Sequence, residues 1–358
     1  MTAPDRERVY LDVLIADPLA TQNVPAIYNQ TYNIPIIKKC SDWQMSVVRF
    51  SCPINAIPLF EFQIERGPLQ TDINLGAYSV TLVRGATIMQ TKLIFDPEVR
   101  NVNPLPNPPS SNPPLYIQDQ STDYYGVYTV QHMLDMFNAA FITAHAGLPV
   151  VPGSAPPHFE YDPATAIITL VAQQANYDVN VPGYTEIWVN NASFRFFQSM
   201  PAQRWGIGLP AGRDNQLIVN SHYNNIVGAD LRISQNNATL SDWNDLTSIV
   251  LGGLSLPTRA EFTPNGGGIT TIASQAPSQV IMTDFIPIPP ENLNQRGTVI
   301  YNPTAEYRWL NLISDSELRT FNITVNWTDR YQNIHLIKFR PDEQLSIKIL
   351  FQKCRSVH

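Results

Sequence analysis

The sequence predicts an all-β protein made of antiparallel strands. Its 358 residues include 30 prolines and 17 glycines. Proline lacks a backbone N–H and is excluded from helix interiors and central strands, so this number favours short elements and many loops. Several segments alternate apolar and polar residues, which is the period of a strand that buries one face. One segment stands out with the spacing of a long helix.

The first hundred residues contain a series of expected strands separated by proline and glycine. Residues 8–19 could form a strand or an extended arm. Pro53 ends one strand and Pro58 opens the next, and Gly85 suits a tight hairpin turn. The strands expected after residue 40 are 43–51, 59–64, 77–85 and 87–95.

A helix is expected near residues 129–146. Thr129 can cap its start, and Gly147 followed by Pro149 can end it. One apolar stripe would pack on a sheet. The stripe recurs every three or four residues through Val130, Met133, Leu134, Phe137, Ala140, Phe141 and Ala144.

The rest of the chain returns to strands. Residues 101–115 hold six prolines and predict an extended linker, where we place a subdomain boundary. Residues 252–268 contain two glycine clusters and are expected to form a loop. Further strands are expected within 158–200, at 215–220, and at four places between 280 and 351.

Composition and charge limit the class of partner. Charged residues make up 15% of the chain, below the usual quarter for soluble domains. Such a chain fits surfaces that bury against other subunits, although a monomer with an uncharged polar surface is the alternative. The net charge is −7 without a basic tail, so no direct nucleic-acid binding is expected. Neither a signal peptide in residues 1–20 nor a membrane span is expected.

No catalytic, cofactor-binding or metal site is predicted. Gly266–Gly268 lack the Lys-Ser/Thr of a phosphate loop. His132 and Asp135 share a helical face, where a weak surface pair is the expected role. Asp242 and Asp245 alone do not meet the ligand pattern of a calcium loop. The sequence therefore favours a protein that is not an enzyme.

The three cysteines do not form an even framework. Cys40, Cys52 and Cys354 are expected to be buried free thiols in a reducing compartment such as the cytoplasm or nucleus. A Cys40–Cys52 bridge is the alternative.

Three stretches carry a resemblance to a known family. They are SDWQMSVVRFSCPINAIPLFEF from residue 41, YYGVYTVQHMLDMFNAAF from residue 124, and the ending from residue 283. The most specific part is the order strand, W-x-D-R-Y-x-N, strand, proline, SIKILFQK. The chain resembles the penton or minor capsid proteins of polinton-like viruses, virophages and related adenovirus-like DNA viruses.

The resemblance implies an antiparallel jelly-roll β-sandwich in the virion, with five copies around each vertex of an icosahedral shell. Its expected partners are copies of itself and the neighbouring major capsid protein. The chain is longer than a minimal jelly roll, so we expect an inserted subdomain that carries the helix. The expected division is an N-terminal arm at 1–35, jelly roll at 36–102, insertion at 103–270 and jelly roll again at 271–358.

Other functions stay open at this stage. The chain could be a major capsid subunit of the facets. It could instead be a carbohydrate-binding attachment module, with exposed aromatic residues beside Asp/Asn pairs in a loop cluster. An enzyme would need a deep polar pocket with paired carboxylates. Trp309 and Trp327 are expected to be buried in the core or in an interface.

Overall fold

The computed structural model divides the chain into two compact units, each of which is described by itself. The terminal unit comprises Met1–Ile57 and Asp245–His358, and the inserted unit comprises Pro58–Asn244. The structure describes residues 7–16, 24–53, 57–65, 73–98, 118, 124–149, 151–204, 212–253, 256–258, 280–285, 298–301, 308–330, 334–339 and 343–354.

Two antiparallel sheets form the terminal unit. The order of the first sheet is β1-β23-β4-β18, with β19 also paired to β4. The order of the second is β17-β16-β20-β21, with β3 also paired to β20. The strands are β1 (Arg8–Ala16), β3 (Ile27–Thr31), β4 (Trp43–Pro53), β16 (Ser248–Gly253), β17 (Val280–Phe285), β18 (Thr298–Tyr301), β19 (Leu310–Asn311), β20 (Thr320–Thr328), β21 (Ile334–Leu336) and β23 (Gln344–Lys353). The short strands β2 (Val24–Pro25) and β22 (Lys338–Phe339) pair with each other, and the 3-10 helix η1 (Cys40–Asp42) precedes β4.

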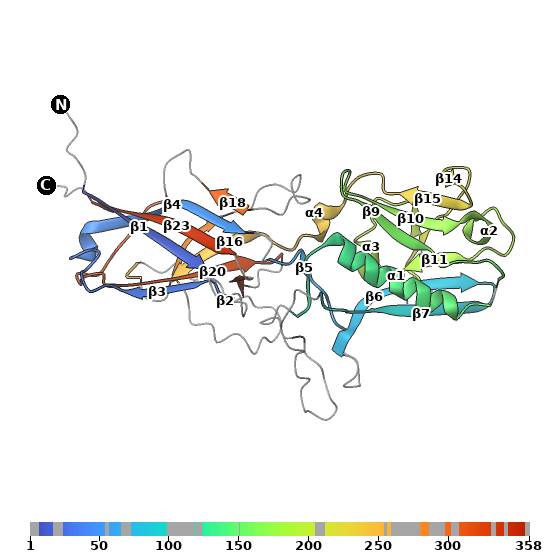
Figure 1. Ribbon diagram of the computed structural model, residues 1–358, viewed down its shortest axis with the longest axis horizontal. Helices are drawn as coiled ribbons and strands as arrows, with labels where there is room; N and C mark the ends of the chain where they lie inside the picture. Colours follow the sequence, from blue (N-terminus) through green and yellow to red (C-terminus); the bar gives the residue numbers. More distant parts are fainter. Residues whose placement is uncertain are drawn as a thin grey trace, which may run out of the picture. The chain divides into compact units, whose positions relative to one another are not determined.

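The strand order is that of a jelly roll. Counting β1, β3, β4, β16, β17, β18, β20 and β23 as first to eighth, the first sheet runs first–eighth–third–sixth. The second sheet runs second–seventh–fourth–fifth, so strands that follow one another in the sequence mostly lie in different sheets. Figure 1 labels most of these strands. This double Greek key confirms the predicted jelly-roll sandwich. The inserted unit lies in the chain between the third and fourth strands.

The core of the terminal unit comes from alternate residues of its central strands. β23 contributes alternate apolar side chains to this core, and β20 does the same from the other sheet, although the intervening Asn322, Thr324 and Asn326 of β20 are buried as well. The Phe321 and Phe351 rings meet edge-on at 6.0 Å between centroids. The residues concerned are Leu345, Ile347, Ile349 and Phe351 on β23, and Phe321, Ile323, Val325 and Trp327 on β20. The alternation in the sequence therefore predicted the buried face of both strands.

The N-terminal segment differs from the arm expected over residues 1–35. Within the part that the structure describes, β1 pairs with β23 along its whole length and β3 pairs with β20. Val13 and Ile15 are buried in the core of the terminal unit. The segment is integral to the sandwich because its apolar face is needed to cover that core.

The inserted unit contains two larger antiparallel sheets and one long helix. Their orders are β14-β15-β10-β9 and β12-β13-β11-β6-β7, and β5 pairs with β8. The strands are β5 (Phe60–Glu61), β6 (Leu75–Arg84), β7 (Thr87–Ile94), β8 (Gly126–Val127), β9 (His158–Asp162), β10 (Ile167–Gln173), β11 (Glu186–Val189), β12 (Ala202–Arg204), β13 (Asn215–Leu217), β14 (Asn225–Val227) and β15 (Asp230–Ser234). The helices are α1 (Val130–Ala146), α2 (Gln174–Tyr177), α3 (Asn191–Phe194) and α4 (Leu240–Trp243).

Two local predictions in this unit are confirmed. The Thr129 hydroxyl accepts a hydrogen bond from the His132 backbone N–H at 3.2 Å, which caps α1 where the sequence placed its start. Gly85 has φ +58° in the two-residue turn between β6 and β7, a conformation that a side chain disfavours.

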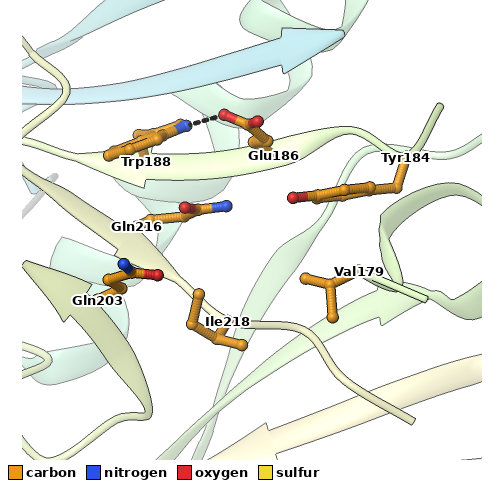
Figure 2. A pocket seen from close by; sticks show the side chains of 7 residues that line it. All are labelled: Val179, Tyr184, Glu186, Trp188, Gln203, Gln216 and Ile218. Carbon is orange, nitrogen blue, oxygen red and sulfur yellow. Dashed lines mark hydrogen bonds between the residues drawn. The ribbon is translucent and has the colours of Figure 1, made fainter. Parts of the chain in front are cut away.

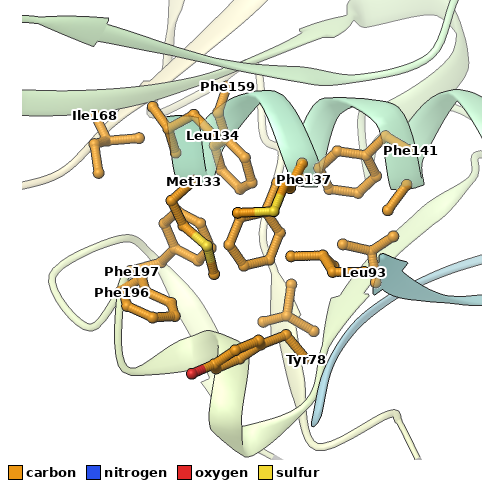
Figure 3. Close-up of a cluster of buried hydrophobic side chains, with 14 of the residues drawn as sticks. Tyr78, Leu93, Met133, Leu134, Phe137, Phe141, Phe159, Ile168, Phe196 and Phe197 are labelled. Atoms are coloured by element: carbon orange, nitrogen blue, oxygen red, sulfur yellow. The ribbon is translucent and has the colours of Figure 1, made fainter. Parts of the chain in front are cut away.

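Helix α1 buries its predicted stripe between the sheets of the inserted unit. Phe137 meets Phe159 of β9 and Phe197 edge-on, with ring centroids 5.8 and 5.0 Å apart (Figure 3). Leu93 of β7 belongs to the same cluster (Figure 3). Aromatic pairs in this geometry add to the gain from burial alone.

The division of the chain differs from the expected insertion at 103–270. Tyr78 of β6 and Leu93 of β7 belong to the same core as α1, so both strands are part of the inserted unit. The loop expected over residues 252–268 begins too early, because Gly252 and Gly253 lie in β16. This strand pairs with β20 in the jelly roll. The boundary expected within 101–115 lies outside the described residues. Alternation predicts that a strand has a buried face, but it does not predict which core receives that face.

The two cores lead to a prediction about fragments. A fragment of residues 58–244 contains the complete core of the inserted unit and should unfold cooperatively by circular dichroism. A matched fragment of residues 103–270 lacks β5, β6 and β7 and should lack cooperative unfolding. The opposite result for the two fragments would contradict this division.

Trp327 tests the core of the terminal unit. Its side chain is only 4% exposed and stacks on His335 with ring centroids 4.2 Å apart. Trp327→Ala should lower the free energy of unfolding by about 3–5 kcal/mol, measured by urea denaturation. The control Trp309→Ala removes a half-buried ring and should cost clearly less. A loss below about 1 kcal/mol at Trp327 would place it outside the core.

Candidate assembly surfaces

The residues singled out by sequence do not assemble into a reactive centre in the part of the chain that is described. There, no group of three or more His, Cys, Asp or Glu side chains is placed to hold a metal. No helix among these residues is long and apolar enough to span a membrane. Gly266–Gly268 lie outside the described residues.

The weak pair expected between His132 and Asp135 is wrong. His132 Nδ1 lies 3.5 Å from a carboxylate oxygen of Glu98, and its Nε2 lies 2.6 Å from the backbone oxygen of Asp96. Asp135 instead accepts a hydrogen bond from Gln131 at 2.7 Å. His132 contacts these residues rather than Asp135 because α1 packs beside the segment that follows β7, which contains Asp96 and Glu98.

The two acidic residues of the SDWNDL segment also have separate roles. Asp242 lies in the short helix α4 of the inserted unit. Asp245 is buried in the terminal unit, where it forms an ion pair with Arg330. The pair satisfies a buried carboxylate that would otherwise be costly.

All three cysteines are free thiols, so the Cys40–Cys52 bridge is absent from the structure. Cys40 and Cys52 are buried, and Cys354 is partly exposed. Burial raises the pKa of the Cys40 thiol. Burial, with the Glu343 carboxylate as a smaller cause, raises the pKa of Cys52 far above its usual range.

Thiol reactivity should separate these cysteines. The thiolate is the reactive form, so raised pKa values and burial both slow reaction at Cys40 and Cys52. At neutral pH, a chromogenic disulfide reagent should titrate one thiol quickly in the native protein and three after denaturation. Cys354→Ser should abolish the fast reaction. A fast reaction that survives this substitution would contradict the assignment.

The outer face of the first jelly-roll sheet is the most informative surface. We define it by Tyr10, Asp12, Leu14, Arg49, Ile300 and Lys348. Strand β1 buries one set of alternate residues in the core, yet the opposite set includes apolar Tyr10 and Leu14. Their exposures are 54% and 59%, and that of Ile300 on β18 is also 59%. Apolar residues on the solvent side of a strand indicate a surface that binds another protein.

Strand register brings these residues together from distant parts of the sequence. Leu14 pairs with Ser346, Ser346 pairs with Ser51, and Ser51 pairs with Ile300. Paired residues point to the same side of a sheet, and neighbouring strands lie about 4.8 Å apart. Leu14 and Ile300 therefore stand about 14 Å apart on one face.

Charged residues lie between the apolar ones. Asp12 Oδ1 is 3.4 Å from Lys348 Nζ and 3.9 Å from Arg49 Nη2. Lys348 Nζ also lies 5.7 Å from the centre of the Tyr10 ring. Exposed ion pairs of this kind contribute little to folding, and they gain strength if a partner excludes water from them. Apolar residues around a paired charge cluster are suited to a specific protein interface.

Sequence reasoning missed this outer face as a site. The signal was present in RVYLDVLIA, where both alternating sets contain apolar residues. The residue Ile300 was not deducible, because it follows Leu14 by 286 positions and its strand β18 is linked to β1 only through the two intervening strands β23 and β4.

These features define the class of protein. Double-sheet jelly rolls recur in viral capsid proteins, lectin domains and cupins. Residues 9–353 match the family described as Sputnik minor capsid protein V18/19, and the chain belongs to this family. It is therefore a structural protein of a virus capsid, which confirms the resemblance seen in the sequence.

Individual relatives agree with the family. The chain is 28% identical over 207 residues to structural protein V19 of Sputnik virophage, covering 54% of this chain and 93% of that protein. A chain in the cryo-EM structure of the Sputnik virophage is 29% identical, with a TM-score of 0.81 and 98% of each chain covered. The mavirus penton protein is 15% identical, with a TM-score of 0.64 over 98% of this chain and all of that one, which shows a shared fold. A minor capsid family does not fit the alternative of a major facet subunit.

Proposed function

We propose that this protein is the penton of an icosahedral capsid, assembling as a ring of five at each vertex. The observation that carries the proposal is the match over 98% of the chain to a chain of the Sputnik virion, with a TM-score of 0.81. The fold shared with the mavirus penton protein supports the same role. The role is structural and not enzymatic, and its partners are copies of itself and the neighbouring major capsid protein.

The jelly-roll surfaces fit such a ring. Five copies close by a head-to-tail contact, in which one face of a subunit meets a different face of the next. The outer face supplies one side of this contact through Leu14 and Ile300. Ile27 and Ile334, 43% and 42% exposed on the second sheet, supply apolar residues for the other side. A charged share of only 15% limits repulsion between close copies.

The mass of the protein in solution tests the proposal. The chain has a mass of 40.2 kDa, so light scattering should give about 200 kDa for the ring. Leu14→Glu places five extra charges in the contact and should shift the protein toward the monomer by at least about tenfold in dissociation constant.

A matched control is Ile142→Glu on α1 of the inserted unit, because Leu14 and Ile142 are both 59% exposed. This variant should keep the mass of the ring. If the wild-type protein is a monomer or trimer in solution, and purified particles also hold it in that state, the pentamer would be overturned. A ring that survives Leu14→Glu would move the contact to another face.

A further inference from the structure

The inserted unit has a hollow on the face of its five-stranded sheet that points away from α1. The hollow holds about 490 Å³. Residues from β11, β12 and β13 form its floor, and Tyr184 stands at its side (Figure 2). This volume lies in the range of small-molecule sites.

Strand register gathers polar side chains there. Trp188 on β11 pairs with Gln216 on β13, and Gln216 pairs with Gln203 on β12. The three side chains therefore form one row on the same face, with strands about 4.8 Å apart. Glu186 lies two residues before Trp188 and points to the same side (Figure 2). On the opposite side of β11, Ile187 and Val189 belong to the core.

A hydrogen bond holds the acidic group in place. Trp188 Nε1 donates to Glu186 Oε2 at 2.7 Å (Figure 2). The Arg213 guanidinium lies 5.9 Å from the centre of the Trp188 ring, and Trp188 as a residue is only 4% exposed. Trp188 is therefore a positioning residue, which leaves Oε1 of Glu186 to face a ligand.

Three polar groups in the hollow have no hydrogen-bond partner among the described residues: the amides of Gln216 and Gln203 and the hydroxyl of Tyr184. Gln216 is only 5% exposed. The amide of Gln216 is not fully enclosed by protein, so it reaches the hollow, where a ligand or water can complete its hydrogen bonds. Figure 2 shows these groups around the same space.

We propose that this hollow binds a carbohydrate through one pyranose ring. Each sugar hydroxyl both donates and accepts, which matches two amides, a phenol and a carboxylate. The half-buried Tyr184 ring can stack on the apolar face of the sugar, and Val179 and Ile218 provide an apolar wall. This site goes beyond the capsid role, which does not depend on it.

Other classes of ligand fit less well. A purely apolar ligand would leave the amides unpaired. A phosphate or nucleic acid would meet the Glu186 carboxylate in a chain with a net charge of −7. The site also differs from the expected sugar module, since Glu186, Gln203 and Gln216 lie on strands where Asp/Asn pairs in loops were expected.

Binding can be measured on the full-length protein. The first probe is an array of immobilised neutral, acidic and sulfated oligosaccharides. The second is saturation-transfer NMR with the methyl glycosides of glucose, galactose, mannose, fucose and N-acetylglucosamine, in which each ligand is monovalent. At least one neutral sugar should bind in both formats.

Two variants locate the site. Gln216→Leu removes the buried amide at similar volume, and Tyr184→Phe removes only the hydroxyl. Each should weaken binding about tenfold, since each leaves a sugar hydroxyl unpaired. Gln131→Leu is the control, because Gln131 is an exposed glutamine on α1. Circular dichroism checks that each variant keeps its fold. If Gln216→Leu does not fold, Tyr184→Phe alone tests the site.

The outcomes are decisive for the hollow. Loss of sugar binding in the two site variants and its retention in Gln131→Leu would support the proposal. Absence of binding to every sugar, or unchanged binding in the site variants, would overturn it. If only sulfated sugars bind, and salt abolishes their binding, the proposal would also be overturned, because that result indicates non-specific charge attraction.

Discussion

The terminal unit depends on one constraint: two sheets pack face to face, and their central strands β23 and β20 each contribute alternate apolar side chains to the core between them. Because the first strand β1 pairs with the last strand β23, the sandwich needs both ends of the chain. The same pairing explains why the segment before β4 belongs to the sheets. It also leaves the connection between β4 and β16 free to carry a large insertion, since neither sheet needs that connection to be short.

The two-residue period has a second consequence, which concerns assembly. Once one set of alternate residues is committed to the core, the other set faces outward and its chemistry is free to vary. In β1 that outward set contains Tyr10 and Leu14 around Asp12. In the proposed ring, a neighbouring copy covers this surface. The low charge of the chain and the apolar outward residues thus reflect one requirement.

The inserted unit satisfies a separate set of constraints with its own aromatic core. Helix α1 occupies one face of the sheet that contains β11, so the opposite face is free of that core. The polar groups of the hollow lie there, on rigid strands whose inner side chains are packed. A site built in this way keeps its geometry without affecting the jelly roll, which is how a capsid subunit can add a binding function to its structural role.

The sequence by itself determined much of the local structure: the strands β4, β6 and β7, the helix near 129–146 with its Thr129 cap, and the Gly85 turn, whereas the strands expected at 59–64 and 215–220 are shorter than predicted. These follow from patterns within a few residues, where period and backbone preference act directly. The jelly roll was predicted from the order of several such patterns and their family resemblance.

Only the tertiary structure decided how the elements are distributed. It assigned β6 and β7 to the inserted unit and β16 to the jelly roll, although all three carry apolar residues. It also placed Leu14 and Ile300 on one face of the first sheet, and Trp188, Gln216 and Gln203 in one row. The physical reason is that an apolar face in the sequence predicts only that the strand packs against some other element. The identity of that partner is set by long-range strand pairing, which local sequence does not encode.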